Sequence, residues 1–92
     1  MAKAIVTLKI MPESPEENLD EITAQAEKIV TEFAGDTDHK VTREPIAFGL
    51  VAVKLMFVMD EKLGGTEGIE AKITGIQGVQ SCETIDVRRA IG

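Results

Sequence analysis

The sequence has neither tryptophan nor tyrosine, and its 92 residues include only three phenylalanines, Phe33, Phe48 and Phe57. Proteins that hold single-stranded nucleic acid usually stack bases on aromatic side chains, so this scarcity argues against such a platform. Basic residues are also few, with ten Lys and Arg against sixteen Asp and Glu and a net charge of −6. Nucleic acid and anionic membranes attract basic surfaces. We therefore expect direct binding to neither.

Cysteine and long apolar runs are equally scarce. The single cysteine, Cys82, cannot form an internal disulfide, which suits the reducing cytoplasm. The most apolar stretch, Leu50–Met59, is interrupted by Lys54 and is shorter than the roughly 18–20 residues of a membrane span. Lys9 interrupts the apolar N-terminal segment, which argues against a signal peptide. We expect one cytoplasmic domain over residues 1–92, because this length suits a single core.

Alternating apolar residues predict four strands. They are expected over residues 4–10, 39–46, 50–59 and 79–88. The third is nearly all apolar, as a strand covered on both faces would be, so it is expected at the centre of a sheet. In the last strand, Ile85 and Val87 alternate with polar residues and are expected to share one face.

Two helices are predicted between these strands. Ser14 is placed to cap the first, with Pro15 at its first position and Glu17 completing a capping box, and Gly35 ends it. Its apolar stripe consists of Leu19, Ile22, Ala26, Ile29, Val30 and Phe33. Thr66 is placed to cap the second helix. The apolar stripe of that helix consists of Ile69, Ile73 and Ile76.

The resulting order of elements is βαββαβ. Right-handed crossovers from the first strand to the second and from the third to the fourth put both helices on one face of the sheet. We therefore predict an α+β fold, a ferredoxin-like βαββαβ sandwich with a four-stranded antiparallel sheet. Strands one and three are expected to be central. The other face of the sheet is expected to be open to solvent or to a partner.

The residues suggest no catalytic or metal-binding constellation. A zinc site takes about four Cys or His ligands, or three and a water, whereas this sequence has only Cys82 and His39, far apart in the chain. The same two residues lack a third group that would orient them as nucleophile and base. The acidic residues at the start of the first helix are expected to be solvated and to offset the helix dipole. We expect no catalytic residue, no metal and no cofactor.

Two features call for more than a folding role. Phe48 lies between Ala47 and Gly49 in a short connection between strands, where residues are usually polar and exposed. Its ring either folds back over the core as a lid or projects as an anchor for a partner. Arg88 and Arg89 place two adjacent cations near the end of an acidic chain, either for solubility or for recognition.

Four segments together resemble the archaeal translation elongation factor 1-beta family. They are Met11-Pro-Glu-Ser-Pro, Glu44-Pro-Ile-Ala-Phe-Gly-Leu-Val-Ala, Gly64-Gly-Thr-Glu and Thr84-Ile-Asp-Val-Arg-Arg. The resemblance runs the length of the chain and implies the same βαββαβ fold. It implies a guanine nucleotide exchange factor that makes and breaks no covalent bond. The implied partner is elongation factor 1-alpha, the GTPase that delivers aminoacyl-tRNA to the ribosome, with its GDP or GTP.

The resemblance also implies roles for particular residues. Phe48 matches the loop aromatic with which the family contacts the GTPase. The family's C-terminus approaches the magnesium and phosphate region, where eukaryotic relatives use a lysine. This chain ends instead in Ala90-Ile91-Gly92. The expected partner-binding residues are Ala47, Phe48, Gly49, Arg88 and Arg89. The free chain is expected to be a monomer.

Two alternatives use the same fold. A ferredoxin-like RNA-binding module would place aromatic residues on the two central strands, where only Phe57 is available. The second alternative is a ligand-sensing or purely structural subunit, which the sequence neither favours nor excludes.

Overall fold

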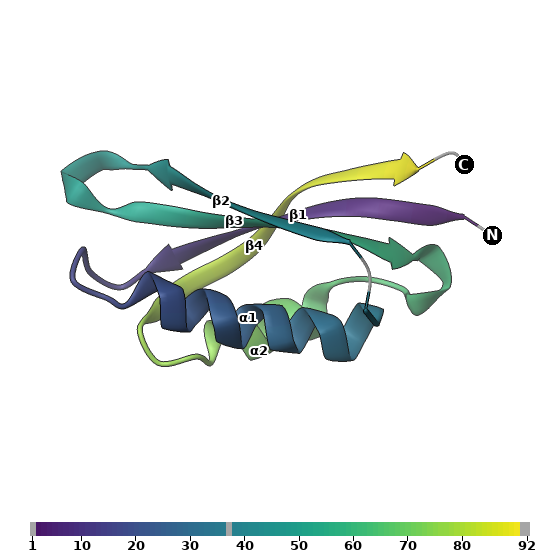
Figure 1. The fold of residues 1–92 in the computed structure, drawn as a ribbon, viewed down its shortest axis with the longest axis horizontal. Helices are drawn as coiled ribbons and strands as arrows, with labels where there is room; N and C mark the ends of the chain where they lie inside the picture. The colour runs from purple at the N-terminus through teal and green to yellow at the C-terminus, as the bar shows by residue number, and fades with distance from the viewer. Residues whose placement is uncertain (1, 37, 91–92) are drawn as a thin grey trace.

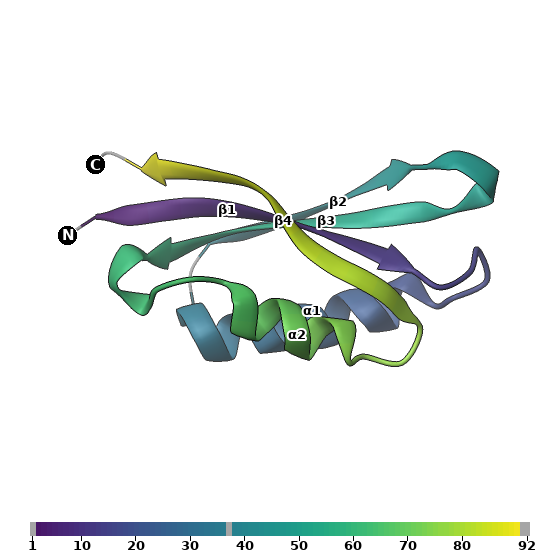
Figure 2. The same cartoon turned by 180° about the vertical axis from the view of Figure 1, so that it is seen from behind.

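A computed structural model describes residues 2–36 and 38–90 of the chain. Its main elements follow the predicted order βαββαβ. They are β1 (Lys3–Pro12), α1 (Leu19–Ala34), β2 (His39–Pro45), β3 (Val51–Asp60), α2 (Glu67–Thr74) and β4 (Val79–Ala90). Figure 1 shows the strands in one layer with both helices beneath it, and Figure 2 shows the same two layers from behind. The predicted α+β sandwich is confirmed.

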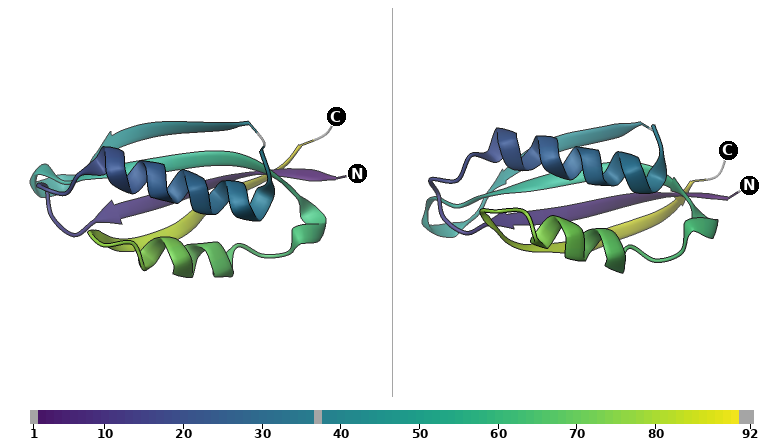
Figure 3. Two further views of the ribbon diagram at one scale, coloured as in Figure 1. Left: turned by 60° about the horizontal axis from the view of Figure 1, so that its bottom comes forward. Right: turned by 90° about the horizontal axis from the view of Figure 1, so that it is seen from below.

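The sheet is antiparallel with the strand order β2-β3-β1-β4, so β1 and β3 are central, as predicted. Ile10 of β1 pairs with Val53 of β3 on one side and with Cys82 of β4 on the other. Helices α1 and α2 both lie across one face of the sheet (Figure 3). Within the part of the chain that the structure describes, no helix covers the opposite face. That face is open, as the sequence predicts.

The core lies between the sheet and the two helices. The central strands supply one half of it with side chains that are at most 1% exposed, namely Val6, Leu8, Ile10, Val53, Leu55 and Phe57. The predicted helical stripes supply the other half with the buried residues Ile22, Ala26, Val30, Ile69 and Ile73. Burial of one such large side chain contributes about 1.5–3 kcal/mol. This layer therefore fixes the sheet, and with it the positions of the loops at the two ends of the sheet.

The expected start of the first helix is wrong. Helix α1 begins at Leu19, and its N-cap is Asn18, whose Oδ1 accepts a hydrogen bond from the backbone N–H of Glu21 (3.1 Å). Ser14 instead closes a separate turn, in which its Oγ accepts the N–H of Glu16 (3.3 Å). The physical reason is that β1 continues to Pro12, so the following residues are needed to cross from the sheet to the helical layer.

The expected cap of the second helix is confirmed in position but not in the bond that its side chain makes. Thr66 occupies the N-cap position of α2, but its side chain makes no capping bond. Its hydroxyl instead forms a hydrogen bond with the hydroxyl of Thr84 in β4 (2.8 Å). A contact with the neighbouring strand has therefore replaced the local cap.

Ile85 and Val87 do not share one face of β4, contrary to the simple alternation. The pairing of β4 with β1 shifts between Thr7 and Leu8, and this shift leaves Ile85 without a partner in β1. Ile85 turns to the open face, beside Thr7. Val87 lies on the helix side of the sheet.

The corrected helix start leads to a stability prediction. We expect Asn18→Ala to lower the free energy of unfolding by about 1 kcal/mol, because the N–H of Glu21 loses its acceptor. Ser14→Ala removes the residue that the sequence favoured as the cap, and we expect it to cost less than half as much. Urea unfolding of both variants measures the difference. Equal losses would contradict the assignment of Asn18 as the cap.

Candidate partner-binding site

Phe48 lies at the tip of the hairpin that joins β2 to β3. The tip is a tight turn over Ala47–Gly49, closed by hydrogen bonds from the Ile46 N–H to the Leu50 carbonyl (2.7 Å) and from the Leu50 N–H to the Ala47 carbonyl (3.2 Å). The residue is 94% exposed, so its ring does not cover the core. The lid alternative is therefore wrong, and the ring projects into solvent.

The backbone at this tip is strained. Phe48 has φ 62° and ψ 32°, the left-handed region, and Gly49 follows with φ 77°. For a residue with a Cβ this conformation costs roughly 1–2 kcal/mol. Strain of this kind persists where the surrounding structure imposes it, and it is concentrated at functional sites. Here the hairpin holds an apolar ring in water at a cost in stability, which makes Phe48 a candidate for contact with a partner.

Arg88 and Arg89 lie at the other end of the sheet. Across β1, their positions correspond to Val58 and Met59 of β3, near the end of that strand, whereas the hairpin tip precedes Val51. At about 3.3 Å per residue, the distance from Val51 to Val58 is about 23 Å. In Figure 1 the β2–β3 hairpin and the two chain ends accordingly lie at opposite ends of the molecule. The structure does not bring Phe48 and the arginines together.

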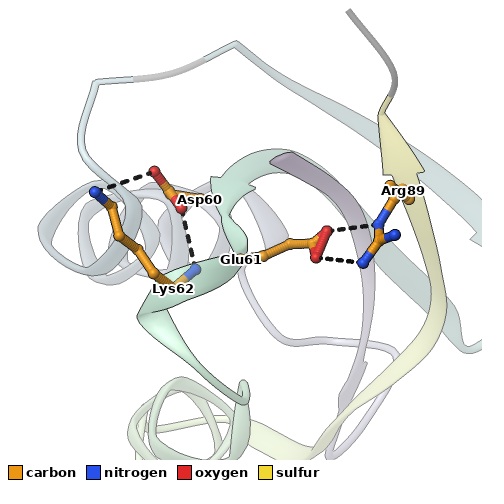
Figure 4. A network of polar contacts seen from close by, with 4 residues as sticks. All are labelled: Asp60, Glu61, Lys62 and Arg89. Carbon is orange, nitrogen blue, oxygen red and sulfur yellow. Dashed lines mark hydrogen bonds and ion pairs between the residues drawn. The ribbon is translucent and has the colours of Figure 1, made fainter. Parts of the chain in front are cut away.

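Arg89 is held by a bidentate ion pair with Glu61, which follows β3 directly. Its Nε and one terminal nitrogen each donate to a different carboxylate oxygen of Glu61, both at 2.9 Å (Figure 4). These hydrogen bonds lower the pKa of the Glu61 carboxyl and raise the pKa of the Arg89 guanidinium. Beside them the Lys62 N–H donates to Asp60 (3.0 Å), which orders the turn that carries Glu61. Arg89 therefore ties the end of β4 to the β3–α2 connection.

Arg88 is less constrained than its neighbour. Its Nε donates to Asp86, two residues away in the same strand, at 2.9 Å. Arg88 lines a shallow groove of about 390 Å³ on the open face together with Lys54 and Met56. Arg89 lines a separate groove of about 440 Å³ on the helix side. The two adjacent cations thus face opposite sides of the sheet. Ile91 and Gly92, the last residues of the predicted tail, lie outside the described residues.

Sequence reasoning missed Glu61, because nothing in the sequence links it to an arginine 28 residues away. The separation of Phe48 from the arginines, in contrast, follows from the predicted topology. In an antiparallel sheet of this order, β4 begins at the end of the sheet that carries the β2–β3 hairpin. The last residues of β4 therefore lie at the other end of the strands.

The other candidate groups do not form a reactive site. Cys82 is buried, and burial, followed by the charges of Glu70 and Glu83, raises the pKa of its thiol to about 12. His39 Nε2 lies 2.8 Å from a carboxylate oxygen of Glu27 on α1. Cys82 lies in β4 and His39 lies in β2, which are the two opposite edge strands of the sheet. Among residues 2–36 and 38–90, no three His, Cys, Asp or Glu side chains are grouped to hold a metal ion.

Two further observations concern the remaining alternatives. Phe57 points into the core and is 0% exposed, so it cannot stack a base on the open face. Phe33 packs against the core from α1, and Phe48 is at the hairpin tip.

None of the helices in the described ranges has both the length and the apolar composition needed to cross a membrane.

Comparison with known proteins gives a consistent result. The family model of the EF-1 guanine nucleotide exchange domain matches residues 5–90. Elongation factor 1-beta of Methanothermobacter thermautotrophicus is 43% identical over 89 residues, covering 97% of this chain and 98% of that protein. The same factor of Methanobrevibacter smithii is 42% identical over 89 residues, with the same coverage. Among solved structures, the de novo designed protein Foldit4 is similar to this chain with a TM-score of 0.64 and 19% identity. The match covers 98% of each chain and shows the fold alone. From these matches and the resemblance of its motifs, the chain belongs to the family of EF-1 guanine nucleotide exchange domains.

Proposed function

We propose that this chain promotes GDP release and GTP reloading on elongation factor 1-alpha by contacting it through both ends of its sheet. The observation that carries this proposal is Phe48, a 94% exposed ring on a strained turn in a chain of an exchange-domain family. An exchange factor needs no covalent chemistry, because it accelerates release by binding the nucleotide-free GTPase better than the loaded one.

The energetics require more than one contact region. A 10⁴-fold shift toward the nucleotide-free state needs about 5.5 kcal/mol of differential binding. Burial of one phenylalanine supplies about 1.5–3 kcal/mol. Phe48, supported by Ala47 and Gly49, is therefore the anchor, and the C-terminal end of β4 supplies the rest. Since these regions are separated by much of the 42 Å long axis, they meet different parts of the GTPase.

The two arginines have different roles in this proposal. A GTPase holds its nucleotide largely through contacts among phosphate, magnesium and the phosphate loop, and a cation at the end of β4 would perturb them. Arg88 is the cation presented to the partner, because it lines the groove of the open face and its Nε bonds to a near neighbour in its own strand, Asp86. Arg89 is engaged by both carboxylate oxygens of Glu61 and holds the strand end in place.

We also infer that residues 1–92 act as one exchange domain, in the cytoplasm, as a monomer when free and without a cofactor of their own. This inference is supported by the single sheet and shared core of the described residues and by the role of the related factors in translation. Size-exclusion chromatography with and without the GTPase measures the stoichiometry. Elution of the free chain as a dimer would contradict it.

The direct test is release of fluorescent GDP from elongation factor 1-alpha. We expect a saturating concentration of this protein to accelerate GDP release by roughly tenfold or more, and to accelerate GTP loading in parallel. A second GTPase of a different family, assayed at the same concentrations, serves as the control and should be unaffected. Unchanged release from elongation factor 1-alpha would overturn the proposal.

A further inference from the structure

Strand β4 contains two residues more than the stretch of β1 with which it pairs, one near its start and one in its middle. Thr84 pairs with Leu8 and Asp86 pairs with Thr7, which leaves Ile85 without a partner in β1. This is a β-bulge, a feature that bends a strand and redirects the side chains beyond it.

The bulge determines which face each arginine occupies. Side chains alternate along a regular strand, so an uninterrupted β4 would put Thr84 and Arg88 on the same face. Thr84 lies opposite Leu8, a core residue on the helix side, whereas Arg88 lies in the groove of the open face. Arg89 consequently turns to the helix side, where it meets Glu61. If the same strand ran without a bulge, the two arginines would exchange faces.

Glu70 of α2 holds β4 immediately before the bulge. Its Oε2 accepts hydrogen bonds from the backbone N–H of Thr84 (2.8 Å) and from the Thr84 hydroxyl (2.6 Å). Because that hydroxyl donates to Glu70, its bond with Thr66 has the Thr66 hydroxyl as donor. Hydrogen bonds to a carboxylate are about twice as strong as those between neutral groups. Helix α2 therefore fixes the residue from which the bulge starts.

We propose that Glu70 is a positioning residue for nucleotide exchange: by holding Thr84 it fixes the bulge at Ile85, which directs Arg88 to the open face of the sheet. Glu70 touches no GTPase atom in this scheme and acts only through β4. The inference rests on the proposed exchange function and identifies what orients its C-terminal contact region.

The first test measures GDP release over a range of chain concentrations, which separates the maximal rate from the half-saturating concentration. We expect Glu70→Ala to lower the maximal rate by about fivefold or more and to change the half-saturating concentration by less than about twofold. Glu70→Gln keeps an oxygen that can accept the Thr84 N–H, and we expect it to restore the rate to within about twofold. Glu67→Ala removes the same charge from the same helix and is the matched control, expected to exchange normally.

The second test removes Ile85. Asp86 then follows Thr84 directly and keeps its partner Thr7, so both arginines retain their faces without a bulge. Glu70 has no bulge left to fix, and adding Glu70→Ala to the deletion should change the maximal rate by less than about twofold. Ile85→Ala keeps the bulge and controls for loss of the side chain. Thermal melting of every variant confirms that it is folded.

The outcomes separate the two proposals. The positioning role is overturned if Glu70→Ala exchanges normally or if Glu70→Gln does not restore exchange. It is also overturned if Glu70→Ala lowers the maximal exchange rate by the same factor in the Ile85 deletion as in the unaltered chain. The last result would mean that Glu70 contacts the GTPase directly. Failure of the exchange function itself gives another pattern, in which even the unaltered chain leaves GDP release unchanged.

Discussion

Replacing Phe48 with alanine is expected to slow the chain-stimulated release of GDP from elongation factor 1-alpha by about tenfold or more, which corresponds to about 1.4 kcal/mol. The melting temperature should change little, because the ring is 94% exposed and packs on no core residue. The loss should appear in both the maximal rate and the half-saturating concentration, because the ring supplies part of the differential binding to the nucleotide-free GTPase as well as part of the docking. Unchanged exchange in this variant would reject the anchor role.

Two further variants sharpen this test. Leu63→Ala removes another exposed apolar side chain, from the β3–α2 connection, and should leave exchange within about twofold. Phe48→Gly removes the ring and also removes the strain of the left-handed backbone. Its free energy of unfolding should therefore be about 1 kcal/mol higher than that of Phe48→Ala. Urea unfolding measures that difference. Phe48→Gly should nonetheless exchange as poorly as Phe48→Ala, which would separate the strain of the turn from the function of the ring.

Deleting Arg88–Gly92 is expected to reduce the maximal exchange rate by about tenfold or more while the half-saturating concentration rises by less than about threefold. The reason is that this end of β4 is proposed to act on the nucleotide site, whereas docking depends mainly on Phe48. Equal losses in rate and affinity would mean that the segment only adheres to the partner.

The deletion also shortens the sheet, because Arg88 and Arg89 pair with Ile5 and Ala4 of β1. Arg88→Gln keeps the backbone pairing and is therefore the cleaner variant. It should reproduce most of the loss in rate without a change in melting temperature. Arg89→Gln, in contrast, breaks the ion pair with Glu61 and should be matched by Glu61→Gln if its role is to hold the strand end.

The fold could be predicted wherever a repeating pattern dominated the sequence. The stripe from Leu19 to Phe33 and the apolar run of β3 depend on burial along whole elements, and both lie where the pattern predicts. Single residues were less predictable. Ser14 satisfies every local rule for a cap, but Asn18 has that role because β1 extends farther than its pattern suggests.

The sequence singles out the candidate residues and their separation along the sheet, but not their detailed geometry. Composition alone could not decide whether Phe48 covers the core or projects, since that depends on a left-handed turn that Gly49 permits. The faces of Arg88 and Arg89 depend on one unpaired residue in β4, which leaves the polar and apolar alternation of the sequence intact. Their anchoring by Glu61 and Glu70 is a tertiary effect without a local signal.

The central strands β1 and β3 run without interruption from the Phe48 hairpin to the end of the sheet that carries the arginines. The spacing between the two proposed contacts is therefore set by rigid, paired backbone and not by the slack of a flexible linker. Lengthening every strand by a pair of residues would move the contacts apart by about 6–7 Å while leaving each one chemically intact. Such a chain should still bind its partner through the hairpin or through the end of β4, but not through both at the same time.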